Sequence, residues 1–303
     1  MRNLSLNMAL MTGFIICWSS GFIGSRLASQ ATLPAMDLFA WRFVIATLIA
    51  ALWWSLSRHR AVTLSGWLRE MSVGALTMGG YLLFVMLAVG QGVSAGSTAL
   101  ITAQQPVLAA VIATLWLREQ LPMAAWLGLG IAASGVALCL AGDWQGTGSA
   151  SGWAYALPLL SVISVTLGSV LATRRPSGLG MPATLTAQLS AASLVFLVAA
   201  FGDGQLERPG SELITRQTLA WLIALSSFGG YGFFTVCLRR VGVSAVSSAI
   251  YLTPPVTLLW SAWMFGENIE TLQLGGMGLA LSGVAITLIA QHHFRHLVGW
   301  AQH

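Results

Sequence analysis

Charge is the first thing that this sequence lacks. Only 8% of its 303 residues are charged, whereas a soluble domain carries about 25%. All 14 basic residues are arginine, so the chain contains no lysine. Hydrophobic residues make up 56% of the chain, and its mean hydropathy is +0.78. So little charge excludes a soluble globular domain, and we expect lipid to cover most of the molecule.

Residues for covalent or metal chemistry are also scarce. Cys17, Cys139 and Cys237 all lie in apolar runs, none has the spacing of a metal site, and we infer no disulfide. The stretch HHFRH (292–296) resembles a metal-binding tract, but we interpret it as a tail anchor at the membrane surface. No nucleotide-binding loop or serine–histidine pair stands in a catalytic setting. We therefore expect no catalytic residue, metal or cofactor, and we do not expect an enzyme.

Apolar runs long enough to cross a bilayer are abundant. A membrane helix needs about 20 residues, and the short connections predict that consecutive helices are antiparallel neighbours. The longest polar stretch is 202–217, so no soluble domain fits between the runs. The sequence predicts an all-α integral membrane protein with ten transmembrane helices. These lie at about 6–27, 36–56, 70–89, 94–117, 123–141, 153–173, 181–201, 218–239, 244–265 and 272–291.

The arginines predict which side of the membrane each connection faces. If the N-terminus lies inside, only Arg26, Arg208 and Arg216 fall in outer connections. Basic residues concentrate on the cytoplasmic side, so both termini are expected there. We interpret the net charge of +5 in this way, and expect a lipid bilayer and a small-molecule substrate, not nucleic acid, as partners. The cytoplasmic arginines are then Arg2, Arg58, Arg60, Arg69, Arg118, Arg174, Arg175, Arg239, Arg240 and Arg295.

The sequence repeats itself half a chain apart. GGYLLFVMLAVGQGVSAGSTA (79–99) and GGYGFFTVCLRRVGVSAVSSA (229–249) are identical at 10 of 21 positions. We therefore predict that 1–147 and 148–303 are two five-helix repeats. Because five is odd, the second repeat must enter the membrane upside down, which makes an inverted repeat. Such repeats allow alternating access to a site near the midplane of the membrane.

Several passages resemble a known group of carriers. WSSGFIG (18–24), WRF (41–43) and LGLGIAASGVAL (127–138) are similar to the drug/metabolite transporter superfamily, and Glu119 and Glu267 before the fifth helix of each half fit it too. The resemblance is to the EamA-type, which has two five-helix repeats, and it extends over essentially the whole chain. It implies a ten-helix carrier of the bacterial inner membrane with cytoplasmic termini. Because the family exports amino acids, other metabolites and drugs, the resemblance does not name a substrate.

Prolines and glycines predict where helices bend and where they touch. Pro106 lies near the middle of the fourth run, and Pro254 and Pro255 lie near the middle of the ninth, so we expect kinks that act as hinges. The alternative is a packing kink without a site. Small residues on the fifth and tenth helices predict close packing of these two helices. They are Gly128, Gly130, Gly135, Gly276, Gly278 and Gly283.

Arg42 is the one arginine clearly inside a predicted span, away from its ends. A charge there is costly unless it is paired or reached by water. We interpret Arg42 as structural, snorkelling outward or pairing with Asp37; the alternative is that it binds a substrate carboxylate. Gln188 is the nearest polar residue at the corresponding place in the second half. No acid or histidine is predicted deep inside a span, which disfavours binding of a cationic drug against a buried carboxylate.

We expect a central cavity between the repeats. The repeated GGY places Tyr81 and Tyr231 in mid-span, where a ring with a polar tip can stack on a substrate and also hydrogen-bond it. The alternative is that both tyrosines only pack in the core or face lipid. The predicted cavity residues are Trp18, Ser19, Tyr81, Gln104, Gln105, Ser164, Thr166, Tyr231, Tyr251 and Thr253.

The predicted function is export of small metabolites, such as amino acids or related neutral and aromatic compounds, by alternating access. A multidrug efflux carrier of the same fold is an alternative. A membrane-embedded enzyme and a channel are alternatives of other classes, and the lack of convergent acid–base residues disfavours the enzyme. The sequence leaves open the substrate, the coupling ion and whether the protein is a monomer or a homodimer.

Overall fold

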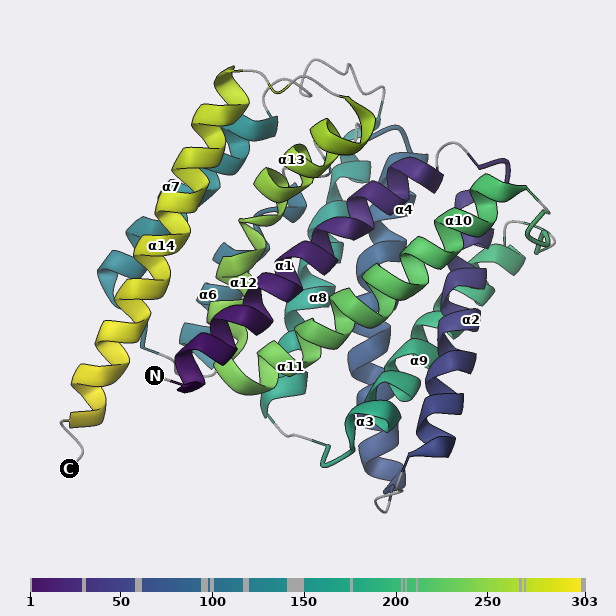
Figure 1. Cartoon of the computed structure of the whole chain (residues 1–303), viewed down its shortest axis with the longest axis horizontal. Coiled ribbons are helices and arrows are strands. Elements are labelled where there is room, and N and C mark those ends of the chain that lie inside the picture. Colours follow the sequence, from purple (N-terminus) through teal and green to yellow (C-terminus); the bar gives the residue numbers. More distant parts are fainter. Residues whose placement is uncertain are drawn as a thin grey trace. The chain divides into compact units, whose positions relative to one another are not determined.

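The computed structural model of the chain is built from helices, and none of the residues that it describes lies in a strand (Figure 1). The predicted all-α class is therefore confirmed. Within the described part, eight helical segments are long and apolar enough to cross a membrane, and Met123–Leu138 is a shorter apolar helix. The described residues are 2–28, 31–57, 62–93, 98, 101–116, 120–140, 150–174, 177–202, 204, 206–210, 212–266, 269 and 271–300.

Two of the eight segments begin several residues earlier than predicted, whereas the other starts agree to within one residue. The third begins at Leu64 and the sixth at Leu213. The early start at Leu64 has a local cause, because the Thr63 hydroxyl accepts a hydrogen bond from the Gly66 N–H (3.2 Å) and so caps the helix. The predicted fourth run, 94–117, lies partly outside the described residues, so the total of ten helices stays a prediction. The segments are Ser5–Ala28, Ala35–Leu56, Leu64–Gly90, Gly152–Arg174, Met181–Gly202, Leu213–Val241, Val243–Phe265 and Thr271–Gln291.

Contacts divide the chain into two compact units, each with segments from both halves of the sequence. Unit 1 comprises Met1–Leu87 and Ile163–Arg240, and unit 2 comprises Ala88–Val162 and Val241–His303. This division concerns contacts in space and does not test the two predicted sequence repeats, which remain a prediction.

In unit 1, α2 packs along α9, and α1 packs along η4. Phe39 and Phe43 of α2 contact Phe196 of α9, with ring centroids 5.5 and 5.4 Å apart. The absence of a side chain at Gly74 lets α3 approach α9, because a Cβ there would overlap the Gln188 backbone. The unit contains α1 (Arg2–Ala28), α2 (Ala35–Leu56), α3 (Leu64–Gly74), η1 (Ala75–Gly80), most of α4 (Tyr81–Gly90), the second part of α8 (Ala156–Arg174), α9 (Met181–Gly202), α10 (Leu213–Trp221), η4 (Leu222–Gly230) and α11 (Tyr231–Val241).

In unit 2, α7 and α14 run side by side over most of their length (Figure 1). A Cβ at Gly128, Gly135 or Gly283 would overlap atoms of the partner helix, so these glycines confirm the predicted close packing. Gly130 and Gly278, by contrast, have open space beside them. The unit contains α6 (Gln105–Trp116), α7 (Met123–Leu140), η3 (Gly152–Tyr155), the start of α8, α12 (Val243–Ile250), α13 (Thr253–Phe265) and α14 (Thr271–Trp300).

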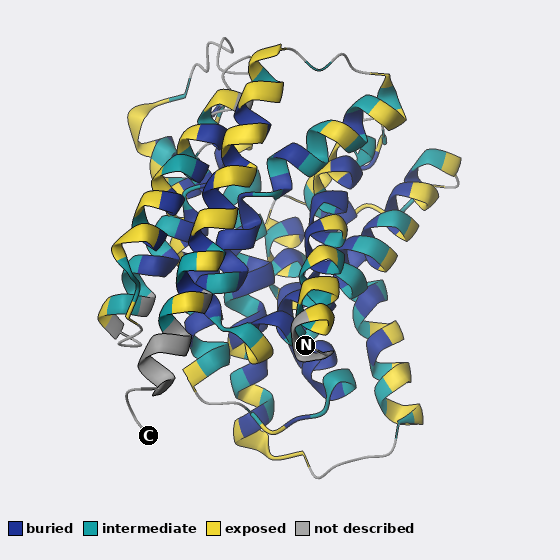
Figure 2. Cartoon of the chain, turned by 60° about the vertical axis from the view of Figure 1, so that its left-hand side comes forward, coloured by how far each residue is buried: buried dark blue, intermediate teal, exposed yellow. Residues whose placement is uncertain are grey.

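The faces of the helices that point away from the core are apolar and exposed. Leu48, Leu52 and Leu56 recur every four residues on α2 and are all exposed, so they form one stripe along the helix. Figure 2 shows the alternation of buried and exposed residues along the helices. Large exposed apolar side chains at helical spacing are what a lipid-facing surface requires.

Two π-helices occupy matching places in the two halves, and the sequence did not predict them. η1 ends at Gly80 and η4 ends at Gly230, and a tyrosine follows each. In η1 the glycine admits a neighbouring side chain, because a Cβ at Gly80 would overlap the Ser164 hydroxyl. That hydroxyl donates a hydrogen bond to the carbonyl of Leu76 (2.8 Å), inside η1. Short π segments concentrate at functional sites.

The prolines lie where regular α-helix is interrupted for two residues, at 103–104 and at 251–252. α12 ends at Ile250, and α13 begins at Thr253 with proline in its first turn. Two consecutive prolines remove two backbone donors, so regular helical hydrogen bonding is interrupted near them. Pro106 likewise is the second residue of α6, a position where the missing N–H costs nothing. The interruption before Thr253 thus lies within the helical segment Val243–Phe265, at the place where the sequence predicted an irregularity. Hinge motion at Pro106, Pro254 and Pro255 stays a prediction.

Candidate functional site

Three of the predicted cavity residues form one aromatic cluster in unit 1. The ring of Trp18 on α1 lies 5.2 Å from that of Tyr231 and 6.4 Å from that of Tyr81, measured between centroids. Phe14 and Phe234 extend the cluster, at 5.4 and 5.2 Å from Trp18. Both tyrosines are buried, so neither ring faces lipid. Each tyrosine directly follows a π-helix, Tyr81 in the first half of the chain and Tyr231 in the second. Both tyrosines lie against the same tryptophan, Trp18.

The small polar residues predicted with this cluster are buried in the same unit. Ser19 and Thr166 have no exposed surface. Ser164 is also buried, and its hydroxyl supports the η1 backbone. These three side chains supply uncharged polar groups in the same unit as the aromatic cluster.

Arg42 is held inside unit 1 by neutral groups. Its Nε donates to the hydroxyl of Ser227 (2.9 Å) and its Nη2 donates to that of Ser226 (2.8 Å), and both serines belong to η4. The guanidinium also lies 5.1 Å from the Phe39 ring centre and 4.9 Å from that of Phe43, which is within cation–π range. With 2% of its surface exposed, the side chain does not snorkel.

The predicted pairing of Arg42 with Asp37 is wrong. Asp37 accepts a hydrogen bond from the Glu207 N–H (3.1 Å). Five residues turn a helix by about 140° beyond a full turn, so the two side chains leave α2 on different faces. Arg42 has no carboxylate partner within the described part of the chain. The guanidinium is therefore a buried cation beside the aromatic cluster.

The remaining predicted residues lie in unit 2. Tyr251 is fully buried in the hydrophobic core, where it packs with Leu129 and Val284. The Tyr251 hydroxyl and the Gln105 side-chain nitrogen have no hydrogen-bond partner among the described residues. Thr253 is buried, and Gln104 is half-buried. One cavity shared by all ten residues stays a prediction.

The structure adds a buried carboxylate that the sequence analysis missed. Glu70 lies about two turns into the third span, because α3 begins at Leu64. Its Oε1 accepts hydrogen bonds from the Ser177 hydroxyl and from Arg239 Nη2 (3.0 Å), and its Oε2 accepts one from Gln188 Nε2 (2.7 Å). The expectation concerned acids deep inside a span, and Glu70 lies in the second turn of α3, toward one end of the third span. In the sequence, the residue that could have indicated the earlier start of α3 is Thr63, because threonine is a frequent helix N-cap.

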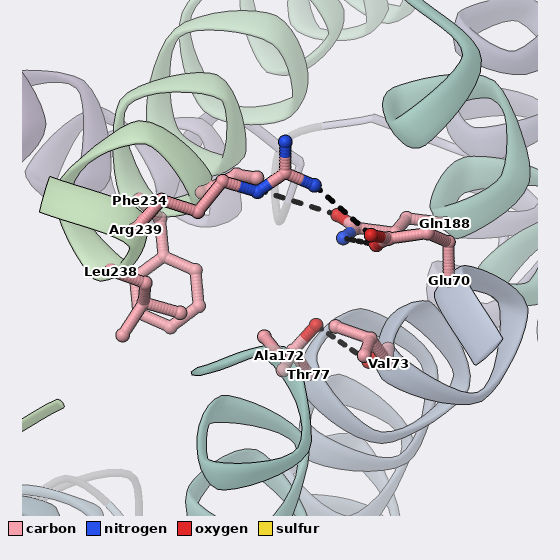
Figure 3. Close-up of a pocket in the computed structure, with 9 residues that line it drawn as sticks. Glu70, Val73, Thr77, Ala172, Gln188, Phe234, Leu238 and Arg239 are labelled. Carbon is pink, nitrogen blue, oxygen red and sulfur yellow. Dashed lines mark hydrogen bonds and ion pairs between the residues drawn. The ribbon is translucent and has the colours of Figure 1, made fainter. Parts of the chain in front are cut away.

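A small pocket lies beside this carboxylate (Figure 3). Its volume of about 10 Å³ is room for one water molecule. Gln188 is the polar residue nearest to the position that corresponds to Arg42 in the predicted repeat. It also accepts a hydrogen bond from Thr235 (3.4 Å). Helices α3, α9 and α11 therefore each contribute polar side chains to the lining of the pocket. It is lined by Glu70, Val73, Thr77, Ala172, Gln188, Phe234, Thr235, Leu238 and Arg239.

Comparison with known proteins agrees with this architecture. Residues 6–141 and 152–289 each match the sequence model of the EamA-like transporter family. The chain belongs to the EamA-like transporter family. The two matches lie one in each half, as expected for an EamA-type protein, and the resemblance drawn from the sequence is confirmed.

Relatives within the EamA family are named as transporters. The chain is 24% identical to the "uncharacterized inner membrane transporter YedA" of Escherichia coli K12, over 96% of this chain and 93% of that one. It is 21% identical to a "probable amino-acid metabolite efflux pump" of Salmonella typhimurium, over 90% and 92%. One solved crystal structure of a protein shares the fold, with a TM-score of 0.76 and 17% identity over 95% of this chain and 98% of that chain. The EamA assignment and the apolar helices together make this a multi-pass membrane protein.

Proposed function

We propose that the protein exports small metabolites, namely amino acids and related neutral or aromatic compounds, across the bacterial inner membrane. Transport would proceed by alternating access between two inverted five-helix repeats, with both termini in the cytoplasm. Membership of a transporter family supports a carrier over a membrane-embedded enzyme. The name of the Salmonella relative, a probable amino-acid metabolite efflux pump, supports amino-acid metabolites as the substrate class.

The observation that carries this proposal is the contact of Trp18 with Tyr81 and Tyr231. The two tyrosines come from corresponding positions of the two halves, so a substrate held between them would touch both repeats at once. Their rings offer apolar faces, and their hydroxyls can hydrogen-bond a polar group. A site of this kind suits a small molecule with both apolar and polar parts.

Movement between the repeats has structural support. Each half contains a π-helix, η1 or η4, and a helix that begins after an interruption, α6 at Gln105 or α13 at Thr253. Irregular backbone in a membrane is tolerated where it lines a cavity or is buried in protein. In our proposal these segments absorb the change in helix direction when one face closes and the other opens.

Exchange measured in proteoliposomes tests the proposal. Vesicles containing the purified protein would be loaded with a mixture of unlabelled amino acids, and entry of each labelled amino acid would be followed. We expect counterflow of at least one neutral or aromatic amino acid above protein-free vesicles. No counterflow of any amino acid, or an ion current without saturation, would contradict the proposal.

A further inference from the structure

Glu70 and Arg239 form an ion pair of unequal burial within unit 1. Their atoms Oε1 and Nη2 lie 3.0 Å apart, and the side chains are 5% and 30% exposed, respectively. Glu70 is fixed by two further donors, from Ser177 and Gln188. Arg239 instead has a second acceptor in the hydroxyl of Thr184 (3.1 Å). The carboxylate is therefore the fixed partner, and the guanidinium is the one that can leave.

The space beside the pair has a polar side and an apolar side (Figure 3). Thr77, Thr235 and Gln188 line it with polar groups, and Phe234 and Leu238 line it with apolar ones. Phe234 is also part of the aromatic cluster, with its ring 5.2 Å from that of Trp18. The pocket beside the ion pair and the cluster around Trp18 thus share one aromatic residue.

The pair stands at one end of the unit only. Glu70 lies in the second turn of α3, and Arg239 lies in the last turn of α11. At the repeat offset of the GGY passages, Ala220 corresponds to Glu70 and Val89 corresponds to Arg239, and neither can form an ion pair. The arrangement is therefore asymmetric, and the arginine bias places this end at the cytoplasm.

We propose that Glu70 and Arg239 are the cytoplasmic binding site for a zwitterionic amino acid, an inference that rests on the proposed function. The substrate ammonium binds the Glu70 carboxylate, and the substrate carboxylate binds the Arg239 guanidinium. The ion pair between Glu70 and Arg239 opens when the substrate binds. Each side chain then pairs with the oppositely charged group of the substrate in place of its partner in the protein. The substrate side chain then lies against Phe234 and Leu238.

The charges explain why a zwitterion fits better than a singly charged molecule. A lone amine at Glu70 would leave Arg239 without its carboxylate, and a lone carboxylate at Arg239 would leave Glu70 charged and buried. Removing one partner of a buried pair is costly because the other stays uncompensated. A zwitterion satisfies both groups, and no net charge enters the membrane.

Binding measurements on the full-length protein in nanodiscs test this site. The probes are L-alanine, L-threonine and L-phenylalanine, each with its amide, which lacks the carboxylate charge, and its N-acetyl derivative, which lacks the ammonium charge. By titration calorimetry we expect the wild-type protein to bind the free amino acid about tenfold more tightly than either derivative, because charge-assisted bonds are lost. Glu70→Gln should remove the preference over the N-acetyl derivative, and Arg239→Gln should remove the preference over the amide.

Two further variants keep the result interpretable if a substitution disturbs folding. Arg239→Lys keeps the charge and should retain part of the preference over the amide. Arg240→Gln is the matched control, since Arg240 is exposed and donates to Asn7 Oδ1 (3.0 Å), away from Glu70. Melting temperatures would be recorded for every variant. If the pair only held α3 to α11, the glutamine variants would change the binding of all three compounds by the same factor, and that result would overturn the site.

The failure of this site and that of the proposed function can be told apart. Wild-type exchange of amino acids in vesicles, together with unchanged charge preferences in Glu70→Gln and Arg239→Gln, overturns the site alone. A wild-type protein that neither binds nor exchanges any of the three amino acids overturns both.

Discussion

The ring of Trp18 lies edge-on to the ring of Tyr231, with centroids 5.2 Å apart and planes at 74°. The same indole faces Tyr81 at 6.4 Å. α1 thus brings its tryptophan to the two tyrosines that stand at equivalent positions of the two halves. This meeting of residues from both halves at one tryptophan is the geometric basis of the proposed substrate site.

Removal of either tyrosine should impair transport more than stability. We expect Tyr81→Ala and Tyr231→Ala each to lower exchange about tenfold, since an aromatic contact contributes about 1 kcal/mol beyond its buried area. Exchange in proteoliposomes and melting temperature would be measured on the same samples. Tyr155→Ala, outside the cluster in η3, is the control. Normal exchange by both variants would reject the site as drawn.

Arg42→Gln should lower stability more than it changes substrate preference. The substitution removes two hydrogen bonds from a charged donor to Ser226 and Ser227, and such bonds contribute about 1.5–3 kcal/mol each. Yield and melting temperature should fall, and the exchange of acids and of uncharged analogues should fall together. Arg216→Gln is the control, since Arg216 is exposed. Normal stability with a selective loss for acids would instead assign Arg42 to the substrate carboxylate.

The glycines between α7 and α14 should tolerate substitution according to their place. Gly283→Ala should lower the melting temperature, because its Cβ would overlap the α7 backbone at Ala132 and overpacking costs about 1–3 kcal/mol. Gly278→Ala, on the same helix with open space beside it, should leave the melting temperature unchanged or raise it. Equal effects of the two substitutions would show that the helices are not in close contact at Gly283.

Fusion reporters should give the predicted orientation. A reporter at the C-terminus or within 57–69 should report the cytoplasm, and one within 202–217 should report the outside, because basic residues concentrate on the cytoplasmic side. Alkaline phosphatase and a fluorescent protein, which are active on opposite sides, would be compared at each place. A periplasmic signal from the C-terminus would contradict both the prediction of ten helices and that of an inverted repeat.

Replacing Asp37 by Asn should leave exchange largely intact. Asp37 lies in the first turn of α2 and accepts a hydrogen bond from the Glu207 N–H, and an amide oxygen can accept the same bond. Initial rates of exchange would be compared with those of wild-type protein at equal reconstitution. Abolished exchange with an unchanged melting temperature would show that this carboxylate takes part in coupling.

Composition and pattern alone predicted the membrane class, and the resemblance of short motifs to known carriers indicated the family. Very low charge and long apolar runs leave only an α-helical membrane fold, because unpaired backbone groups cannot lie in lipid. The repeated GGY passage singled out Tyr81 and Tyr231, and the prolines marked Pro106 and Thr253 as places where helices are interrupted. These features are local, so the neighbouring residues are enough to reveal them.

Contacts between distant segments were decided only by the tertiary structure. Arg42 bonds Ser226 and Ser227 instead of Asp37, because helix rotation separates it from Asp37 and packing brings η4 beside α2. Glu70 is buried and hydrogen-bonded because α3 begins at Leu64, after the Thr63 cap, and because Gln188 of α9 and Arg239 of α11 donate hydrogen bonds to it. Sequence periodicity shows which face of a helix is apolar, but the partner of a buried polar group depends on which helices pack together, and that is a property of the whole fold.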